Sequence, residues 1–436
     1  MRNLNRRDCL RAASAAVGGL SLSGWLPLMA DQLATDPRRR RHGILLWMSG
    51  GPTQTDTFDM KPGHENGGEF QEIETNVPGV RFSEHLPRLA THADKLAIVR
   101  GLSTKEGDHS RGTHLMRTGK PPMGTTRYPA IGAALSKELG SDELSLPRYV
   151  SIAPYRAFSQ EAYGPGFLGP RYSPLVVGAN DSGAIDKPGD GQYANLVVDA
   201  VQHAPGISDG QMNRRLELWD RLQTNFVKTH PGAAPAAHHT VYRSAVNLMQ
   251  SDAASAFDLE READDVRQKY GNGLFGQGCL MARRLIEQGV SFVEVSLNGW
   301  DTHSNNFEAV QGLSEQLDNG WASLMEDLDE RGLLESTTIL WMGEFGRTPQ
   351  INAQAGRDHF PSGWSCVFAG GGMAGGQAYG RTSPDGRMVE DGKMGVSDVL
   401  ATLCAAVGVD PATKNISDTG RPLPIVDGSA VNALLA

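Results

Sequence analysis

The stretch GILLWMSGGP, residues 43–52, indicates how the rest of the chain folds. It begins as an uninterrupted apolar run and stops at a serine, two glycines and a proline. A short apolar run that ends at Gly and Pro is typical of a strand buried on both faces. Comparable runs occur at residues 96–99, 291–297, 337–342 and 365–369. We therefore expect a sheet that is covered on both sides.

Helical patterns lie between these apolar runs, and each pattern stops at a glycine, the usual signal just past the last turn. They cover residues 109–118, 130–139, 274–288 and 307–331. Alternating helices and buried strands predict the α/β class, with a doubly wound, mainly parallel sheet and helices on both faces. In such folds the sites lie at the carboxyl ends of the strands.

Residues 207–270 break this alternation. Three helical segments, 211–228, 240–251 and 256–269, follow one another there without a strand between them. We expect a single domain over residues 43–436 that carries a helical insertion at 207–270.

The N-terminus has the layout of a removable signal peptide over residues 1–30, with a basic start and a weakly apolar stretch. The pair Arg6 and Arg7, followed by Leu10, resembles a twin-arginine signal, which the Tat export machinery reads. A basic linker, 31–42, follows. The apolar stretch is too short and too rich in Gly and Ser for a stable transmembrane span, so a periplasmic or extracellular protein is expected. An uncleaved signal that anchors the protein, or a basic N-terminus of a cytosolic protein, are the alternatives.

Composition excludes several partners and cofactors. The 436 residues carry a net charge of −9, which argues against a general nucleic-acid or anionic-membrane binder. The glycine cluster at 370–376 lacks the GxGxxG order, so no nucleotide cofactor is expected. Outside the signal the cysteines are Cys279, Cys366 and Cys404, which are not at metal-ligand spacing, and we expect buried free thiols.

Polar side chains follow the predicted strands of the C-terminal half. Asp301 and His303 come after the run 291–297, and Glu344 after 337–342; Asp358 and His359 follow further on. Alternate residues of an extended loop point the same way, so a carboxylate and an imidazole can face one ion. Such a donor set suits Zn, Mn or Fe better than Ca. The alternative is that these residues are loop caps and satisfied polar groups.

Two segments of the N-terminal half add candidates. Asp56, in the loop that leaves the first predicted strand, joins the candidate metal ligands. A predicted helix opens with His109, Ser110 and Arg111, and the free N–H groups and dipole of a helix start favour an anion. A plain N-cap, Asp108 or Ser110, is the competing interpretation.

Taken together, these segments resemble the alkaline phosphatase and sulfatase superfamily. The resemblance is closer to an exported family within it that carries twin-arginine signals and is known as a domain of unknown function. The tail, with a closing helix and a DGS segment, is also similar to sulfatases. The matching stretches are residues 45–59, 69–70, 83–87, 106–111, 116–119, 299–303, 343–349, 356–359, 397–408 and 426–429.

The resemblance implies a metal site. It places Asp301 and His303 on one metal and His359 at the position of a late metal-binding histidine. Glu344 stands where active members carry an Asp-His pair, and Phe345 occupies the position of the expected histidine.

The resemblance also places the start of the helix at His109 where sulfatases hold their nucleophile and its arginine. Formylglycine chemistry is disfavoured, because no Cys stands there and Cys279 is followed by Met281 where Pro or Ala is required. Ser110 is then the candidate nucleophile, with His109 as its base or as a metal ligand. Arg111 would steady an anionic substrate through paired N–H donors.

From the sequence we thus expect an exported hydrolase of sulfate or phosphate esters that depends on a divalent transition metal. Its substrate would be a small anionic ester or a sulfated or phosphorylated glycan. The alternative is a non-catalytic binding or scaffold protein that keeps the hydrolase fold, since a fold does not fix a function.

Overall fold

The computed structural model describes residues 41–141, 144–178, 192–198, 206–230 and 232–436. The predicted signal peptide, and all but the last two residues of the predicted linker, lie outside this part of the chain. Within it, no helix is both long enough and apolar enough to cross a membrane.

A central eight-stranded sheet organises the molecule, with the strand order β12-β4-β11-β8-β1-β7-β5-β6. The apolar runs predicted as strands all lie in this sheet, which confirms the α/β class. Its strands in chain order are β1 (His42–Ser49), β4 (Leu96–Leu102), β5 (Tyr149–Ile152), β6 (Leu175–Val177), β7 (Phe292–Asn298), β8 (Thr337–Met342), β11 (Trp364–Gly370) and β12 (Gln377–Tyr379).

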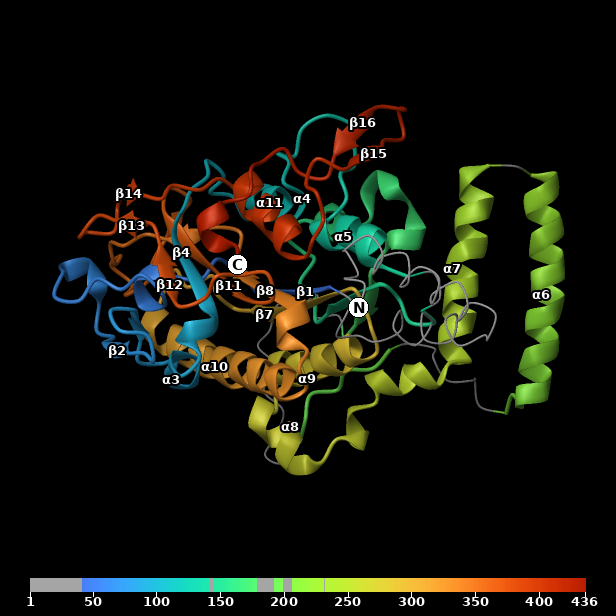
Figure 1. Ribbon diagram of the computed structural model, residues 1–436, viewed down its shortest axis with the longest axis horizontal. Coiled ribbons are helices and arrows are strands. Elements are labelled where there is room, and N and C mark those ends of the chain that lie inside the picture. The colour runs from blue at the N-terminus through green and yellow to red at the C-terminus, as the bar shows by residue number, and fades with distance from the viewer. Residues whose placement is uncertain (1–40, 142–143, 179–191, 199–205, 231) are drawn as a thin grey trace, which may run out of the picture.

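Helices cover both faces of the sheet (Figure 1). Helices α9 and α10 lie on one face, and α4, α5 and α11 lie on the other. The helices are α3 (Pro87–Ala90), α4 (His109–Thr118), α5 (Ile131–Leu139), α6 (Asp209–Thr229), α7 (Ala233–Met249), α8 (Asp264–Tyr270), α9 (Leu274–Glu287), α10 (Asn306–Glu330) and α11 (Val396–Ala406).

Strand β1 divides the core into two layers. All of its residues are buried, because β7 and β8 pair with it on either side and helices cover both of its faces. Ile44 and Leu46 pack into the core under α9 and α10. Leu45 and Trp47 pack into the core under α4, α5 and α11. A side-chain period of two therefore explains why this strand is apolar throughout.

One strand of the sheet runs against the others. β11 is antiparallel to both β4 and β8, whereas the remaining pairs are parallel. The N-terminal end of β11 therefore lies at the same edge as the carboxyl ends of its neighbours. Residues just before β11 reach the edge where the sites of such a sheet lie.

The segment 207–270 is helical where the structure describes it, with two differences from the expected helices. The Ala-rich residues 233–239 belong to α7, whose first turn contains Pro235, a place where proline is tolerated. The third expected helix, 256–269, is broken into 3₁₀ turns followed by α8. The break has a local cause, since the side chains of Ser251 and Asp258 accept bonds from nearby backbone N–H groups. In Figure 1, α6 and α7 form a hairpin that projects from the body.

A buried ion pair joins α4 to the sheet. Arg117, near the end of α4, donates to Glu294 of β7 at 2.5 Å, and both side chains are at most 1% exposed. Tyr149 of β5 donates its hydroxyl to the same carboxylate at 2.8 Å. The guanidinium also lies over the ring of Tyr163, 3.6 Å from the centroid. These contacts fix the position of α4 on the sheet.

We expect the variant Arg117→Met to lose about 3–5 kcal/mol of unfolding free energy, because it leaves the charge of Glu294 buried without a partner. Urea unfolding followed by circular dichroism measures this loss. The double variant Arg117→Met/Glu294→Leu should recover most of it, since no buried charge remains. A single variant as stable as the wild type would contradict this account of α4.

Candidate functional site

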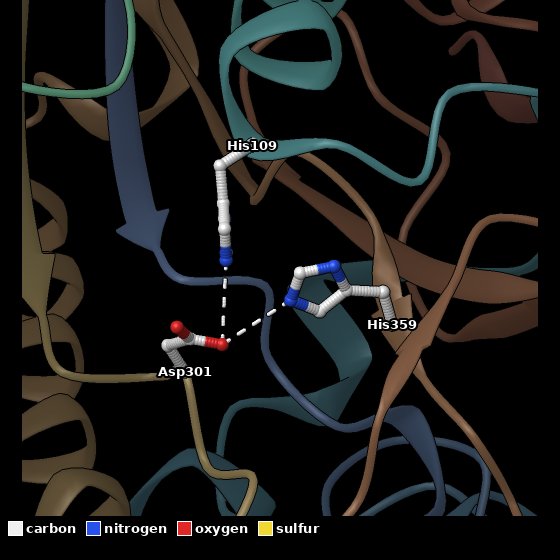
Figure 2. A group of neighbouring side chains, drawn as sticks. All are labelled: His109, Asp301 and His359. Carbon is white, nitrogen blue, oxygen red and sulfur yellow. Dashed lines mark hydrogen bonds and ion pairs between the residues drawn. The ribbon is translucent and has the colours of Figure 1, made fainter.

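Three connections of the central sheet meet at one carboxylate oxygen, Oδ1 of Asp301. His109, the first residue of α4, places its Nε2 atom 3.3 Å from this oxygen. The Nε2 atom of His359, just before β11, also lies 3.3 Å away. The corresponding atom of His303 lies 3.1 Å away. Figure 2 shows His109 and His359 pointing at Asp301 from two different elements.

The second ring nitrogen of each imidazole, Nδ1, has a hydrogen-bond partner of its own. The Nδ1 atom of His109 lies 2.7 Å from Oε1 of Glu344, and that of His303 lies 2.8 Å from Oδ1 of Asp358. The Nδ1 atom of His359 lies 2.8 Å from the carbonyl oxygen of Gly107. A carbonyl only accepts, so His359 carries its proton on Nδ1 and, when neutral, turns the lone pair of Nε2 toward Asp301.

Close approach of the loops requires glycine at two positions. Gly50, after β1, has φ of 111°, and a Cβ atom there would lie 2.4 Å from the backbone nitrogen of Asp301. A Cβ atom on Gly356 would lie 1.9 Å from the carbonyl oxygen of His303. Any other residue at either position would push the loops that carry the site apart.

Arg347 ties its own connection and the loop after β1 to Asp301, a role that the sequence reasoning missed. This fully buried side chain donates to Oδ1 of Asp301 at 2.5 Å and to the carbonyl oxygen of Gly51 at 3.0 Å. It sits in the short strand β9 (Gly346–Arg347), which pairs with β10 (His359–Phe360) so that Arg347 faces His359. A charged residue inside the glycine-rich loop that follows a buried strand was the available signal.

The start of α4 differs from the expected anion site. Asp108 is the N-cap, and its side chain accepts from the backbone N–H of Arg111 at 3.0 Å. Arg111 is engaged by Glu106 through two donors, at 2.6 and 2.7 Å. The Ser110 side chain is exposed. Of the residues predicted at this helix start, His109 is the one that joins the group around Asp301.

Asp56, predicted as a metal ligand, belongs to a separate ion pair. It is fully buried, and both of its oxygens accept from Arg357, each at 2.7 Å. Asn306 and Thr53 also donate to it, at 2.8 and 2.9 Å. Because these donors occupy both oxygens, we leave Asp56 out of the candidate ligands.

Aromatic rings line one side of the group. Phe158 stacks on His109 with ring centroids 4.1 Å apart and planes 9° apart. Phe345, which stands where the resemblance expects a histidine, lies 4.9 Å from the ring of His109 and 4.5 Å from that of His359. These rings hold the two imidazoles in place. The sequence reasoning also missed Phe158, which lies outside the motifs.

Neighbouring charges shift the pKa values of His109, Asp301 and Asp358. Burial by itself lowers the pKa of His109, but the nearby carboxylates of Asp301 and Glu344 outweigh it and raise this pKa to about 9. Burial raises the pKa of Asp301, whereas the bonds from His109, His359 and Arg347 hold it well below its usual range. The bond from His303 lowers the pKa of Asp358.

The donor set fits a transition metal. Ligand atoms of His109, Asp301 and His359 lie within 4.8 Å of one another. Bonds of 2.0–2.1 Å to a tetrahedral zinc ion place ligand atoms about 3.3–3.4 Å apart. The two distances of 3.3 Å from Asp301 to the histidines match this spacing. The Nε2 atom of His109 is also buried, without a hydrogen-bond partner of adequate geometry.

Comparison with known proteins places the chain in a sequence family. The family model described as "Protein of unknown function (DUF1501)" matches residues 40–435. The sequence matches no curated protein.

Several solved structures are similar in fold. The lipoteichoic acid synthase LtaP from Listeria monocytogenes is 9% identical, over 92% of this chain and 77% of its own, with a TM-score of 0.43. The PsFucS1 sulfatase from Pseudoalteromonas sp. is 12% identical, over 90% and 71%, with a TM-score of 0.40. A protein of the alkaline phosphatase superfamily from Vibrio parahaemolyticus is 12% identical, over 85% and 67%, with a TM-score of 0.35. At these identities the reaction has to be argued from the site.

In metal-free protein, the imidazole of His109 should titrate near pH 9 instead of its ordinary value of 6.5. Because its pKa is raised in the folded state, its stabilising contribution is complete below pH 6.5 and is lost as the pH rises through about 9. Two-dimensional NMR of the histidine rings measures this, and the variant His109→Ala identifies the signal. Titration of that signal near 6.5 would show that the two carboxylates do not hold the proton.

Proposed function

The chain belongs to the DUF1501 family, and from the geometry of its site we propose that it is a metal-dependent hydrolase of sulfate or phosphate esters. The substrate class follows from the resemblance of its motifs to the alkaline phosphatase and sulfatase superfamily. A small anionic ester or a sulfated or phosphorylated glycan, met outside the cytoplasm after Tat export, remains the expected substrate.

One observation carries the proposal: the Nε2 atoms of His109 and His359 face the same oxygen of Asp301, and their Nδ1 atoms are bonded elsewhere. Histidines that bind metals usually donate their second ring nitrogen to a carboxylate or carbonyl. We propose these three residues as the ligands of a zinc, manganese or iron ion.

We leave His303 outside the ligand set, because four protein ligands would close a tetrahedral site and a catalytic site keeps one position open. His303 is 45% exposed at the rim, with its Nδ1 atom held by Asp358. Its Nε2 atom lies 3.0 Å from that of His359, beside the proposed ion. From there it can hold a proton for the departing alcohol.

The metal ion and the side chains would supply different parts of the chemistry. When bound, a divalent transition metal acts as a Lewis acid that polarises an ester oxygen and helps a nucleophile to lose its proton. Hydrolysis forms a bond from phosphorus or sulfur to the nucleophile oxygen, whose proton passes to solvent, and breaks the bond to the alcohol oxygen, which takes up a proton. His303 supplies that proton at Nε2. Water is the nucleophile, or Ser110 attacks first and a water molecule then hydrolyses the seryl ester, which restores the serine hydroxyl.

A second function is supported by a specific contact. Arg111, the expected clamp for an anionic substrate, is already bonded to Glu106 through two donors. If this pair persists when substrate is present, the site binds its ligand without the expected clamp. This contact favours the alternative, a binding or scaffold protein that keeps the hydrolase fold.

Protein purified without chelators should contain about one equivalent of transition metal, because the ligands are assembled in the folded chain. The variant His359→Ala should bind the metal more than about 100-fold less tightly. Loss of a ligand should cost more than loss of a residue that only supports a ligand, which typically costs 10- to 100-fold. His92→Ala is the matched control, since His92 contacts Glu326 outside the group. Elemental analysis and chelator competition measure both. Less than about a tenth of an equivalent in the wild type would end the metal assignment.

Metal-loaded protein should hydrolyse an aryl sulfate or an aryl phosphate, with turnover reduced by about 100-fold or more in His303→Ala, as expected for loss of a proton donor. The variant Ser110→Ala shows whether Ser110 or water is the nucleophile. Turnover survives in this variant if water attacks and is lost if Ser110 attacks. His109→Ala should be inactive through loss of a ligand. Activity unchanged in His109→Ala would rule out this centre, whereas bound metal without turnover on either ester would support the binding function.

A further inference from the structure

Glu344 was predicted as a metal ligand. In the structure its carboxylate contacts Nδ1 of His109, the ring nitrogen that does not face Asp301. Glu344 follows β8 directly, and its side chain is completely inaccessible to solvent. The residues whose ligand atoms lie within 4.8 Å of one another are His109, Asp301 and His359, without Glu344. Its position therefore needs an explanation other than metal binding.

One oxygen of Glu344, Oε1, already accepts two hydrogen bonds, whereas Oε2 is buried without a partner among the described residues. Oε1 accepts from Nδ1 of His109 at 2.7 Å and from the backbone N–H of Gly50 at 2.9 Å. The second contact fixes the carboxylate against the loop after β1. The first contact directs Nε2 of His109, and not Nδ1, toward Asp301.

The surroundings leave this carboxylate little freedom. Gly112 lies one turn along α4, and a Cβ atom there would be 3.3 Å from Cβ of Glu344. This added Cβ atom on Gly112 would also lie 3.2 Å from the ring of Phe345. The close packing of α4 on residues 344–345 keeps the carboxylate under the start of the helix, where His109 stands.

We infer that Glu344 is a positioning residue, which sets the orientation and tautomer of His109 so that its Nε2 atom meets the metal. This inference rests on the proposed metal site. A carboxylate behind a metal-binding histidine raises the basicity of the ring and prevents it from turning, and losing such a partner typically costs 10- to 100-fold in metal affinity.

Three variants test this inference by zinc affinity, measured by chelator competition. Glu344→Ala removes the oxygen that accepts from both donors and should weaken zinc binding by about 10- to 100-fold. Glu344→Gln keeps an oxygen that can accept from both donors, so it should recover most of the loss. Asp327→Ala removes a buried acid that bonds Tyr270 on another part of the fold and should leave the zinc affinity unchanged.

Two spectroscopic measurements separate positioning from a general loss of structure. The Nδ1 proton of His109, shielded by a buried acceptor, should give an exchange-protected signal in zinc-loaded wild type and Glu344→Gln, but not in Glu344→Ala. The cadmium-113 resonance of the loaded protein should stay in place in Glu344→Gln, because the ligands are unchanged. A large displacement would make Glu344 a ligand and overturn the inference.

The results distinguish a failure of the proposed metal site from a failure of the proposed role of Glu344. If wild-type protein binds no zinc, the proposed function fails. If the wild type binds zinc and Glu344→Ala binds it equally well, the metal site stands and the role of Glu344 is refuted. Thermal unfolding of each variant shows whether a loss of affinity comes from unfolding.

Discussion

The site depends on the need to neutralise one carboxylate, that of Asp301. Its Oδ1 atom accepts from Arg347 and faces Nε2 of His109 and His359; His109 follows β4, whereas Arg347 and His359 both lie between β8 and β11. A partly desolvated charge that so many positive or polar groups approach is expensive to leave unpaired. The loops after β4, β7 and β8 are held together through this atom, and the site is their meeting point.

The part of the fold that could be predicted is the part that depends on local pattern. The continuous apolar run of β1 and the glycine stops of α4 and α10 follow from burial and chain geometry. The strand β5 escaped notice because it is short and carries polar residues, among them Ser151, which contacts Glu294 inside the core. Its polarity is explained by a buried ion pair that links residues far apart in the sequence.

The site was predictable to a similar depth. The proximity of Asp301, His303, Glu344 and His359 could be predicted because polar residues follow buried strands, and parallel strands share an edge. Their individual roles could not be found in this way. Whether a carboxylate faces an ion, a histidine or an arginine depends on contacts between segments that are hundreds of residues apart, as for Glu344 with His109 and Asp56 with Arg357.

Buried acids secure both ends of α4. Glu294 holds Arg117 near its last turn, and Glu344 holds His109 at its first residue. The helix therefore cannot slide along the sheet without breaking one of these contacts. The position of His109 is set as much by the core beneath the helix as by the residues around it.

The reversed direction of β11 affects how this protein can diversify. Because β11 runs back against β8, the connection 343–363 leaves and re-enters the sheet at the same rim. Its first and last residues contribute to the charged cluster, while its middle is free of any crossing to the opposite edge. An insertion in the exposed turn 353–355 would leave the strand order intact, whereas one at Gly356 or Arg357 would displace the cluster, because these residues pack on His303 and pair with Asp56.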